Sequence, residues 1–225
     1  MSKILGTITI GQSPRRDVIP EMEEFFGIDT KVIEAGALDG LTLEEIEKFA
    51  PDENDYVLVS KLRDGTSVRF GEKHILPRLQ ECIDLLETKG ADIILFICTG
   101  VFPDVFKSSV PLLYPQKMIH GLVPSLLDKG KLAVITPDKS QVKQSVDKWS
   151  EVFQNIIVVS ASPYTKEDDF SEAIEIIKTS DADVVVMDCM GYTNQMKKRV
   201  AEETGKVVIL SRTIVARVIG EMLSN

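Results

Sequence analysis

Short apolar runs rich in Val, Ile and Leu alternate along the chain with longer segments in which apolar residues have helical spacing. Continuous runs of this kind are typical of strands covered on both faces of a parallel sheet. The pattern predicts strands over residues 4–10, 31–35, 92–98, 131–136, 156–160, 183–188 and 207–210. It predicts helices over residues 14–26, 72–88, 117–128, 139–153, 169–179, 192–204 and 212–223. Alternating strands and helices form parallel sheets with right-handed crossovers, so we expect an α/β protein.

Three internal matches indicate that the chain consists of two duplicated halves. Residues 91–100 (ADIILFICTG) match residues 182–191 (ADVVVMDCMG), with Ala, Asp, Cys and Gly in the same places and an offset of 91 (189 − 98). Two weaker matches follow in the same order: residues 6–13 with 133–140, offset 127 (133 − 6), and residues 112–127 with 208–223, offset 96 (208 − 112). The repeated order predicts two pseudo-symmetric domains, each with a parallel sheet flanked by helices.

The first half carries an insertion. The offset falls from 127 to 91, which places about 36 extra residues (127 − 91) between the first strand and Cys98. Within this stretch, residues 56–70 (YVLVSKLRDGTSVRF) contain two β-prone segments around Arg-Asp-Gly and predict a β-hairpin. The hairpin is expected either to cover the ligand site or to mediate homodimer formation, and the sequence leaves both open.

Composition and charge narrow the class of ligand. The chain has 225 residues, 44% of them hydrophobic, and a net charge of −9, which argues against nucleic-acid or membrane binding but permits a local cationic pocket for a small anion. No signal peptide or membrane-spanning apolar stretch is present, and three cysteines do not suggest a disulfide framework. We therefore expect a cytoplasmic protein. The two histidines lack metal-ligand spacing and no nucleotide-binding motif occurs, so neither a metal nor another cofactor is expected.

Cys98 and Cys189 are the candidate catalytic residues. They occupy equivalent positions of the two halves, each at the carboxyl end of a predicted strand and each followed at two residues by glycine. Ligands of open parallel sheets bind at this edge, and two thiols on opposite sides of a carbon suit proton abstraction and return. A cysteine is more often a small buried hydrophobe. That interpretation fits Cys82, which shares a helical stripe with Leu79 and Leu86.

Asp188 has two open interpretations. A carboxylate directly before Cys189 would oppose thiolate formation unless strand alternation turns it away. Alternatively, it orients the substrate.

The segment GQSPRRD, residues 11–17, predicts an anion site. Ser13 suits an N-cap and Pro14 the first helical position, so Arg15 and Arg16 are expected in the first helical turn, where the helix dipole disfavours cations. A bound carboxylate or phosphate would relieve this repulsion. In the other interpretation, neighbouring acidic residues such as Asp17 neutralise the arginine on the surface.

Further candidates for substrate binding lie beside the second helix start and beside the thiols. Ser211 and Arg212 repeat the arrangement of a capping serine followed by an arginine. Hydrogen bonds to a carboxylate are also expected from Thr99, Gly100, Gly191 and Tyr192, although packing explains Tyr192 equally well.

At residues 7–21 (TITIGQSPRRDVIPE), 97–100 (ICTG), 187–192 (MDCMGY) and 210–223 (LSRTIVARVIGEML) the chain resembles the AroM family, over essentially its whole length. That family is associated with aromatic amino-acid biosynthesis in some bacteria. More distantly, the layout with one cysteine per half is similar to the aspartate/glutamate/hydantoin racemase superfamily, which includes maleate isomerase and arylmalonate decarboxylase types. This resemblance implies cofactor-independent chemistry by a pair of thiols, at Cys98 and Cys189, acting on a carboxylate.

The resemblance also implies domain boundaries and a range of substrates. The last helix is expected to return to the first domain, giving domains of residues 1–113 plus 212–225 and 114–211 with a ligand cleft between them. Amino-acid racemases carry Cys-Asn-Thr where this chain has residues 98–100 (CTG), and Cys-Thr where it has residues 189–190 (CM). An amino-free acid is therefore expected as a substrate alongside an amino acid.

The function predicted from these observations is that of a cofactor-independent racemase or isomerase of a small carboxylate. Cys98 and Cys189 would transfer protons, while Ser13, Arg15 and Thr99, together with Gly191, would hold the carboxylate oxygens. Two alternatives remain open: a non-catalytic metabolite-binding or regulatory protein linked to aromatic amino-acid biosynthesis, and a lyase or decarboxylase that uses a single thiol.

Overall fold

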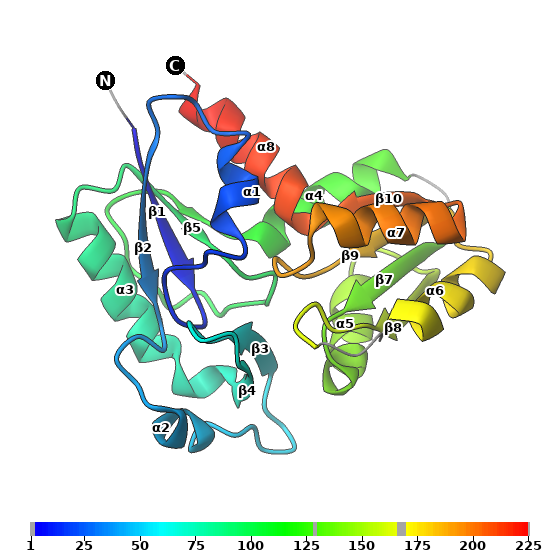
Figure 1. Cartoon of the computed structure of the whole chain (residues 1–225), viewed down its shortest axis with the longest axis horizontal. Helices are drawn as coiled ribbons and strands as arrows, with labels where there is room; N and C mark the ends of the chain where they lie inside the picture. Colours follow the sequence, from blue (N-terminus) through cyan, green and yellow to red (C-terminus); the bar gives the residue numbers. More distant parts are fainter. Residues whose placement is uncertain (1–2, 128–129, 166–169, 225) are drawn as a thin grey trace. The chain divides into compact units, whose positions relative to one another are not determined.

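The computed structural model describes residues 3–127, 130–165 and 170–224 (Figure 1). The chain forms two compact units, one of Met1–Pro115 with Ala216–Asn225 and one of Gln116–Val215. Each unit is an α/β structure around its own four-stranded sheet. The last helix, α8 (Ser211–Leu223), begins in the second unit and ends in the first.

The sheet of the first unit is wholly parallel and has the order β2-β1-β5-β6. Its strands are β1 (Ile4–Thr9), β2 (Lys31–Gly36), β5 (Ile93–Phe96) and β6 (Leu112–Leu113). The helices of this unit are α1 (Ile19–Glu23), α2 (Leu43–Glu47) and α3 (Leu76–Thr88), and a 3-10 turn over Glu72–His74 leads into α3. Because β1, β5 and β2 carry buried residues on both faces, their apolar runs are nearly continuous.

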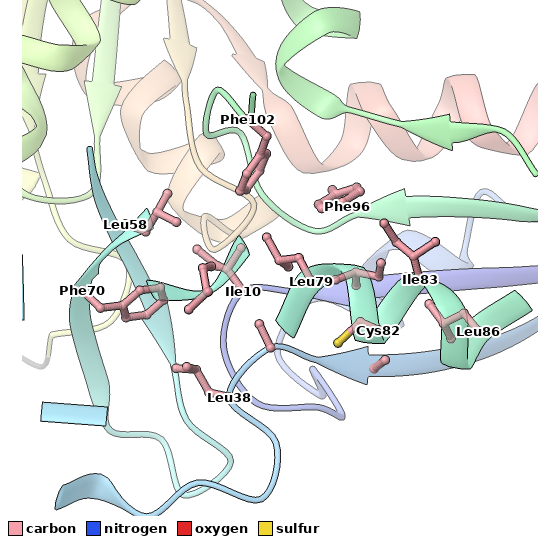
Figure 2. Close-up of a cluster of buried hydrophobic side chains, with 14 of the residues drawn as sticks. Ile10, Leu38, Leu58, Phe70, Leu79, Cys82, Ile83, Leu86, Phe96 and Phe102 are labelled. Atoms are coloured by element: carbon pink, nitrogen blue, oxygen red, sulfur yellow. The ribbon is translucent and has the colours of Figure 1, made fainter. Parts of the chain in front are cut away.

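An antiparallel hairpin forms the predicted insertion in the first unit. Strands β3 (Val57–Lys61) and β4 (Ser67–Gly71) pair with each other, and Gly65 adopts φ +95° in the connecting turn. The hairpin contributes Leu58 and Phe70 to the core that α3 covers. Figure 2 shows Cys82 on α3 in this core, so the interpretation of Cys82 as a buried hydrophobe is correct.

The second unit repeats this layout. Its parallel sheet has the order β8-β7-β9-β10. The strands are β7 (Leu132–Thr136), β8 (Ile156–Ser160), β9 (Val184–Met187) and β10 (Val207–Leu210). The helices are α4 (Pro115–Leu126), α5 (Val142–Ser150), α6 (Phe170–Thr179), α7 (Asn194–Thr204) and α8, and a 3-10 turn over Lys139–Gln141 precedes α5. The predicted fold class, two parallel sheets flanked by helices with a hairpin in the first half, is confirmed.

The strand registers of the two sheets are related by the offsets between the sequence matches. Gly6 pairs with Ile94 on β1 and β5, and Ala133 pairs with Val185 on β7 and β9, which gives offsets of 127 (133 − 6) and 91 (185 − 94). The third offset, 96 (208 − 112), relates the outer pairs Ile94–Leu112 and Val185–Val208. Equivalent strands thus occupy equivalent places and registers in the two sheets.

The helix expected over residues 14–26 is much shorter than predicted. Only Ile19–Glu23 is helical, with Pro20 in the first turn. A longer helix would place Pro20 in its interior, where proline lacks a hydrogen-bond donor and its ring clashes with the preceding turn. The expectation that Ser13 and Pro14 begin a helix, with Arg15 in its first turn, is therefore wrong; these residues lie in the loop between β1 and α1.

Candidate active site

Cys98 follows the end of β5 by two residues and is half-buried. Its sulfur accepts the backbone N–H of Gly100 at 3.2 Å. A methyl group at Gly100 would lie 3.0 Å from Leu58 Cδ2 and 3.3 Å from the sulfur of Cys98. Glycine is therefore suited to the close approach of the backbone to the thiol and to the hairpin.

Cys189 stands in the same relation to β9, two residues after its end, and is buried. Its sulfur accepts the backbone N–H of Gly191 at 3.3 Å. The hydroxyl group of Tyr164 lies 3.8 Å from the sulfur, and a methyl group at Gly191 would overlap the Tyr164 ring. Each thiol is thus held at the carboxyl edge of its sheet by the N–H of the glycine two residues on.

Ser13 is fixed by an acidic partner. Its hydroxyl donates to Asp39 Oδ2 at 2.5 Å and its backbone N–H to Asp39 Oδ1 at 2.8 Å. Arg63 in turn donates to the carbonyl oxygen of Ser13 at 2.7 Å and to Asp39 at 3.0 Å. Ser13 therefore lies in a network that joins the loop after β1 to the hairpin turn, and its hydroxyl proton is committed to Asp39.

Arg15 is buried and folds back onto its own loop. Its Nε and Nη2 donate to the two carboxylate oxygens of Asp17 at 2.9 Å, and its Nη1 donates to the hydroxyl of Thr9 at 3.0 Å. Burial alone would raise the pKa of Asp17, but the hydrogen bond and charge of Arg15 outweigh it and lower that pKa. Asp17 is thus the partner of Arg15, as the second interpretation expected, but the arginine lies in the interior rather than on the surface.

Ser211 and Arg212 support the backbone that follows β9. Ser211 is the first residue of α8, and its hydroxyl donates to the carbonyl of Met187 at 2.8 Å, so it does not act as the N-cap that the sequence suggested. Arg212 is fully buried and donates to the carbonyls of Met190 at 2.9 Å and Gly191 at 3.1 Å. Arg212 therefore holds the two residues directly after Cys189 in place.

Among the remaining candidates, Thr99 is buried beside Cys98. Tyr192 is fully buried, donates its hydroxyl to the carbonyl of Ala161 at 2.7 Å and packs edge-on against Phe170. These contacts match the packing interpretation of Tyr192. The helix that follows begins only at Asn194, with Thr193 as its N-cap.

A buried polar cluster next to Cys189 was not anticipated from the sequence. The carboxylate of Asp188 forms an ion pair with Lys148 and accepts the indole N–H of Trp149 at 2.7 Å. The His120 ring lies 4.5 Å from that of Trp149, and burial, together with the charge of Lys148, lowers the pKa of His120 to about 4. Cys189 belongs to the core under α6 and α7, whereas Asp188 is bound by residues of α5.

Across residues 3–127, 130–165 and 170–224, no group of three or more His, Cys, Asp and Glu side chains is arranged to hold a metal ion. Among these residues, no helix has the length and apolar character needed to cross a membrane.

Several solved structures share this fold. Allantoin racemase from Klebsiella pneumoniae is similar with a TM-score of 0.65 and 11% identity, over 99% of this chain and 88% of that one. Glutamate racemase from Campylobacter jejuni subsp. jejuni has a TM-score of 0.62 and 15% identity, over 98% of this chain and 84% of that one. An aspartate racemase homologue from Pyrococcus horikoshii OT3 has a TM-score of 0.62 and 16% identity, with complete coverage of both chains. At these identities the likeness establishes the fold alone.

Sequence comparison identifies the family. No curated protein sequence matches the chain. The AroM protein family matches residues 5–223, which span both units and include both thiols and the loop after β1. The chain therefore belongs to the AroM family.

Proposed function

We propose that this AroM family protein is a cofactor-independent racemase or isomerase that acts on a small carboxylate through Cys98 and Cys189. One observation carries the proposal. The two thiols follow equivalent strands, β5 and β9, in sheets of matching register, and each accepts the N–H of the glycine two residues later. Both thiols thus lie at the sheet edge where open parallel sheets bind ligands.

The matching registers support a gene duplication as the origin of the two halves. All three sequence offsets recur as strand-pair offsets. The offset between β2 and β8 is 124 (157 − 33), so about 33 of the extra residues (124 − 91) fall between β2 and β5, where the hairpin lies. Duplication gives each half one thiol at the sheet edge where open parallel sheets bind ligands.

Two thiols provide the groups that inversion at a carbon requires. One thiolate removes the proton from the carbon next to the carboxylate, and the other thiol donates its proton to the opposite face. The reverse reaction exchanges the two roles. The mechanism requires that both sulfurs reach one substrate carbon from opposite sides.

The carboxylate is proposed to bind next to the thiols, at Thr99, Gly100 and Gly191, where the backbone N–H groups of Gly100 and Gly191 would have to be shared with the sulfurs of Cys98 and Cys189. Ser13 and Arg15 stay predicted contacts, and each of them would have to share its hydrogen bonds with Asp39 or Asp17. Two racemases of similar fold are described by their names as acting on allantoin and on glutamate. Glutamate is a small carboxylate, which supports this class of substrate without selecting one member of it.

The test is hydrogen exchange in D2O, followed by proton NMR, with aspartate, glutamate, malonates, maleate, and shikimate and chorismate intermediates. Each enantiomer of a chiral acid is incubated separately with wild type and with Cys98→Ala, Cys189→Ala and Cys82→Ala. We expect both site variants to lose racemisation and Cys82→Ala to retain it. Residual exchange in the two site variants should be confined to opposite enantiomers, because each keeps the base for one face only.

Full activity in both Cys98→Ala and Cys189→Ala would contradict the thiol mechanism. Loss of activity in only one of them would favour a lyase or decarboxylase that uses a single thiol. Saturable ligand binding with no exchange of any acid would indicate a binding protein instead.

A further inference from the structure

We propose that a cavity in the first unit, lined by residues 14–17 and 61–65, binds the phosphate or carboxylate group of a small, multiply charged anion. The cavity has a volume of about 360 Å³ and lies between the loop after β1 and the turn of the hairpin. This volume is at the lower end of those of small-molecule sites. The proposal goes beyond the thiol chemistry, because neither Cys98 nor Cys189 lines the cavity; it shares Arg15 with the predicted carboxylate contacts of the proposed function.

The cavity is cationic in an acidic protein. Its lining contains four basic and two acidic side chains, for a formal charge of +2 (4 − 2): Arg15, Arg16, Lys61 and Arg63 against Asp17 and Asp64. The whole chain has a net charge of −9. A local field of opposite sign attracts small anions to this cavity.

Within the described residues, two of these cations are not held in an ion pair, although the charge of Lys61 contributes to the lowered pKa of Asp17. Arg15 is engaged by Asp17, and Arg63 by Asp39. In contrast, the side chains of Arg16 and Lys61 form no hydrogen bond or ion pair within residues 3–127, 130–165 and 170–224. Arg16 is exposed and Lys61 half-buried. Both line the same cavity, so an incoming oxyanion would gain two charge-assisted hydrogen bonds without first breaking an ion pair.

The walls of the cavity are tied together before any ligand arrives. Arg63 donates its backbone N–H to the side chain of Gln12 at 3.1 Å and its Nε to the carbonyl of Ser13 at 2.7 Å. The Gln12 side chain also donates to the carbonyls of Leu38 and Leu41. The hairpin turn is therefore anchored to the loop that carries Arg16. Such preorganisation lowers the entropic cost of binding.

The proposal is tested by NMR titration of the full-length protein with inorganic phosphate, a tricarboxylate and acetate at constant ionic strength, because salt screens exposed charges. Backbone amide signals of residues 14–17 and 61–65 report binding. Arg16→Ala and Lys61→Ala remove the two uncommitted cations, and neither residue takes part in the proposed thiol chemistry. Lys178→Ala removes an exposed cation of the second unit as the matched control.

We expect phosphate or the tricarboxylate to bind saturably and acetate to bind more weakly. Each of Arg16→Ala and Lys61→Ala should raise Kd by about tenfold or more, since a hydrogen bond to a charged group is lost. Lys178→Ala, and a Cys98→Ala/Cys189→Ala variant, should bind as wild type does. Preference for phosphate or for the tricarboxylate identifies which group the ligand carries. Absence of saturable shifts at these amides, or equal weakening by Lys178→Ala, would overturn the proposal.

Discussion

Replacing Lys148 by methionine should strongly destabilise the second unit. The side chains of Lys148 and Asp188 are 7% and 3% exposed and form an ion pair, and Asp188 also accepts the indole N–H of Trp149. Methionine has a similar length and no charge. Asp188 would then stay buried after losing Lys148, and of the two donors Lys148 and Trp149 only the indole N–H of Trp149 would remain.

The expected loss follows from the burial of the unpaired carboxylate. Removing one partner of a buried ion pair costs about 3–5 kcal/mol. With a urea m-value of about 2 kcal/mol/M, a loss of about 4 kcal/mol lowers the unfolding midpoint by about 2 M. Asp188→Asn keeps an acceptor for Trp149. In the double variant Lys148→Met/Asp188→Asn no charge is left unpaired, so its loss should be smaller than the sum of the two single losses by about 1–3 kcal/mol.

Trp149 provides the assay, because it is the one tryptophan of the chain and belongs to this cluster. Its fluorescence follows the unfolding of the second unit in urea without a contribution from another tryptophan. The double-mutant cycle is measured at one pH and one salt concentration. A Lys148→Met variant within about 1 kcal/mol of wild type, or strict additivity of the two changes, would refute the account of this pair.

Three further predictions concern glycine packing, pH and thiol reactivity. Gly220→Ala should lower the free energy of unfolding of the first unit by about 1–3 kcal/mol, because its methyl group would overlap the carbonyl oxygen of Phe25; urea unfolding followed by circular dichroism measures this loss. Gly121→Ala, on α4 of the second unit with open space around it, should stabilise by about 0.5–1 kcal/mol in the Trp149 urea assay. Burial lowers the pKa of His120 from 6.5 to about 4, so the unfolded chain binds the proton first and stability should fall as the pH falls from 6.5 to 4; a slope that His120→Gln leaves unchanged would contradict this. Burial, with a contribution from Asp39, raises the pKa of the Cys82 thiol to about 12, so iodoacetamide at pH 8 should modify Cys98 well before Cys82, as judged by peptide mass spectrometry.

The apolar pattern predicted the strands of the sheets correctly, because a strand that is buried on both faces appears in the sequence as a continuous apolar run. Strands such as β1, β7 and β9 coincide with their predicted positions to within one or two residues. The local chemistry of loops was harder to read. The helix was predicted to begin at Pro14, but α1 begins next to Pro20, and the short helix α2 was not predicted although Thr42 and Glu45 form a capping box.

The positions of the two thiols were predictable because the matching segments of the sequence place them at equivalent strand ends. The contacts of Arg15 and Arg212 could not be predicted from the sequence in the same way. Arg212 stays a predicted substrate contact, but its donation to the main chain after Cys189 was not foreseen. The cluster of Lys148, Trp149 and Asp188 joins side chains that are far apart in the sequence: the residue numbers of Trp149 and Asp188 differ by 39. No local pattern marks such a contact, because it depends on how α5 packs on the sheet.

The central claim, that Cys98 and Cys189 serve one ligand, is tested most directly by observing all three thiols during one titration. Protein labelled with 13C at cysteine Cβ is titrated with the carboxylic acid that exchanges fastest in D2O, and Cys82 is the internal control. We predict that the signals of Cys98 and Cys189 shift along a single saturation curve at one ligand per chain, while Cys82 stays in place. Two independent curves, or a shift of only one thiol signal, would contradict the claim.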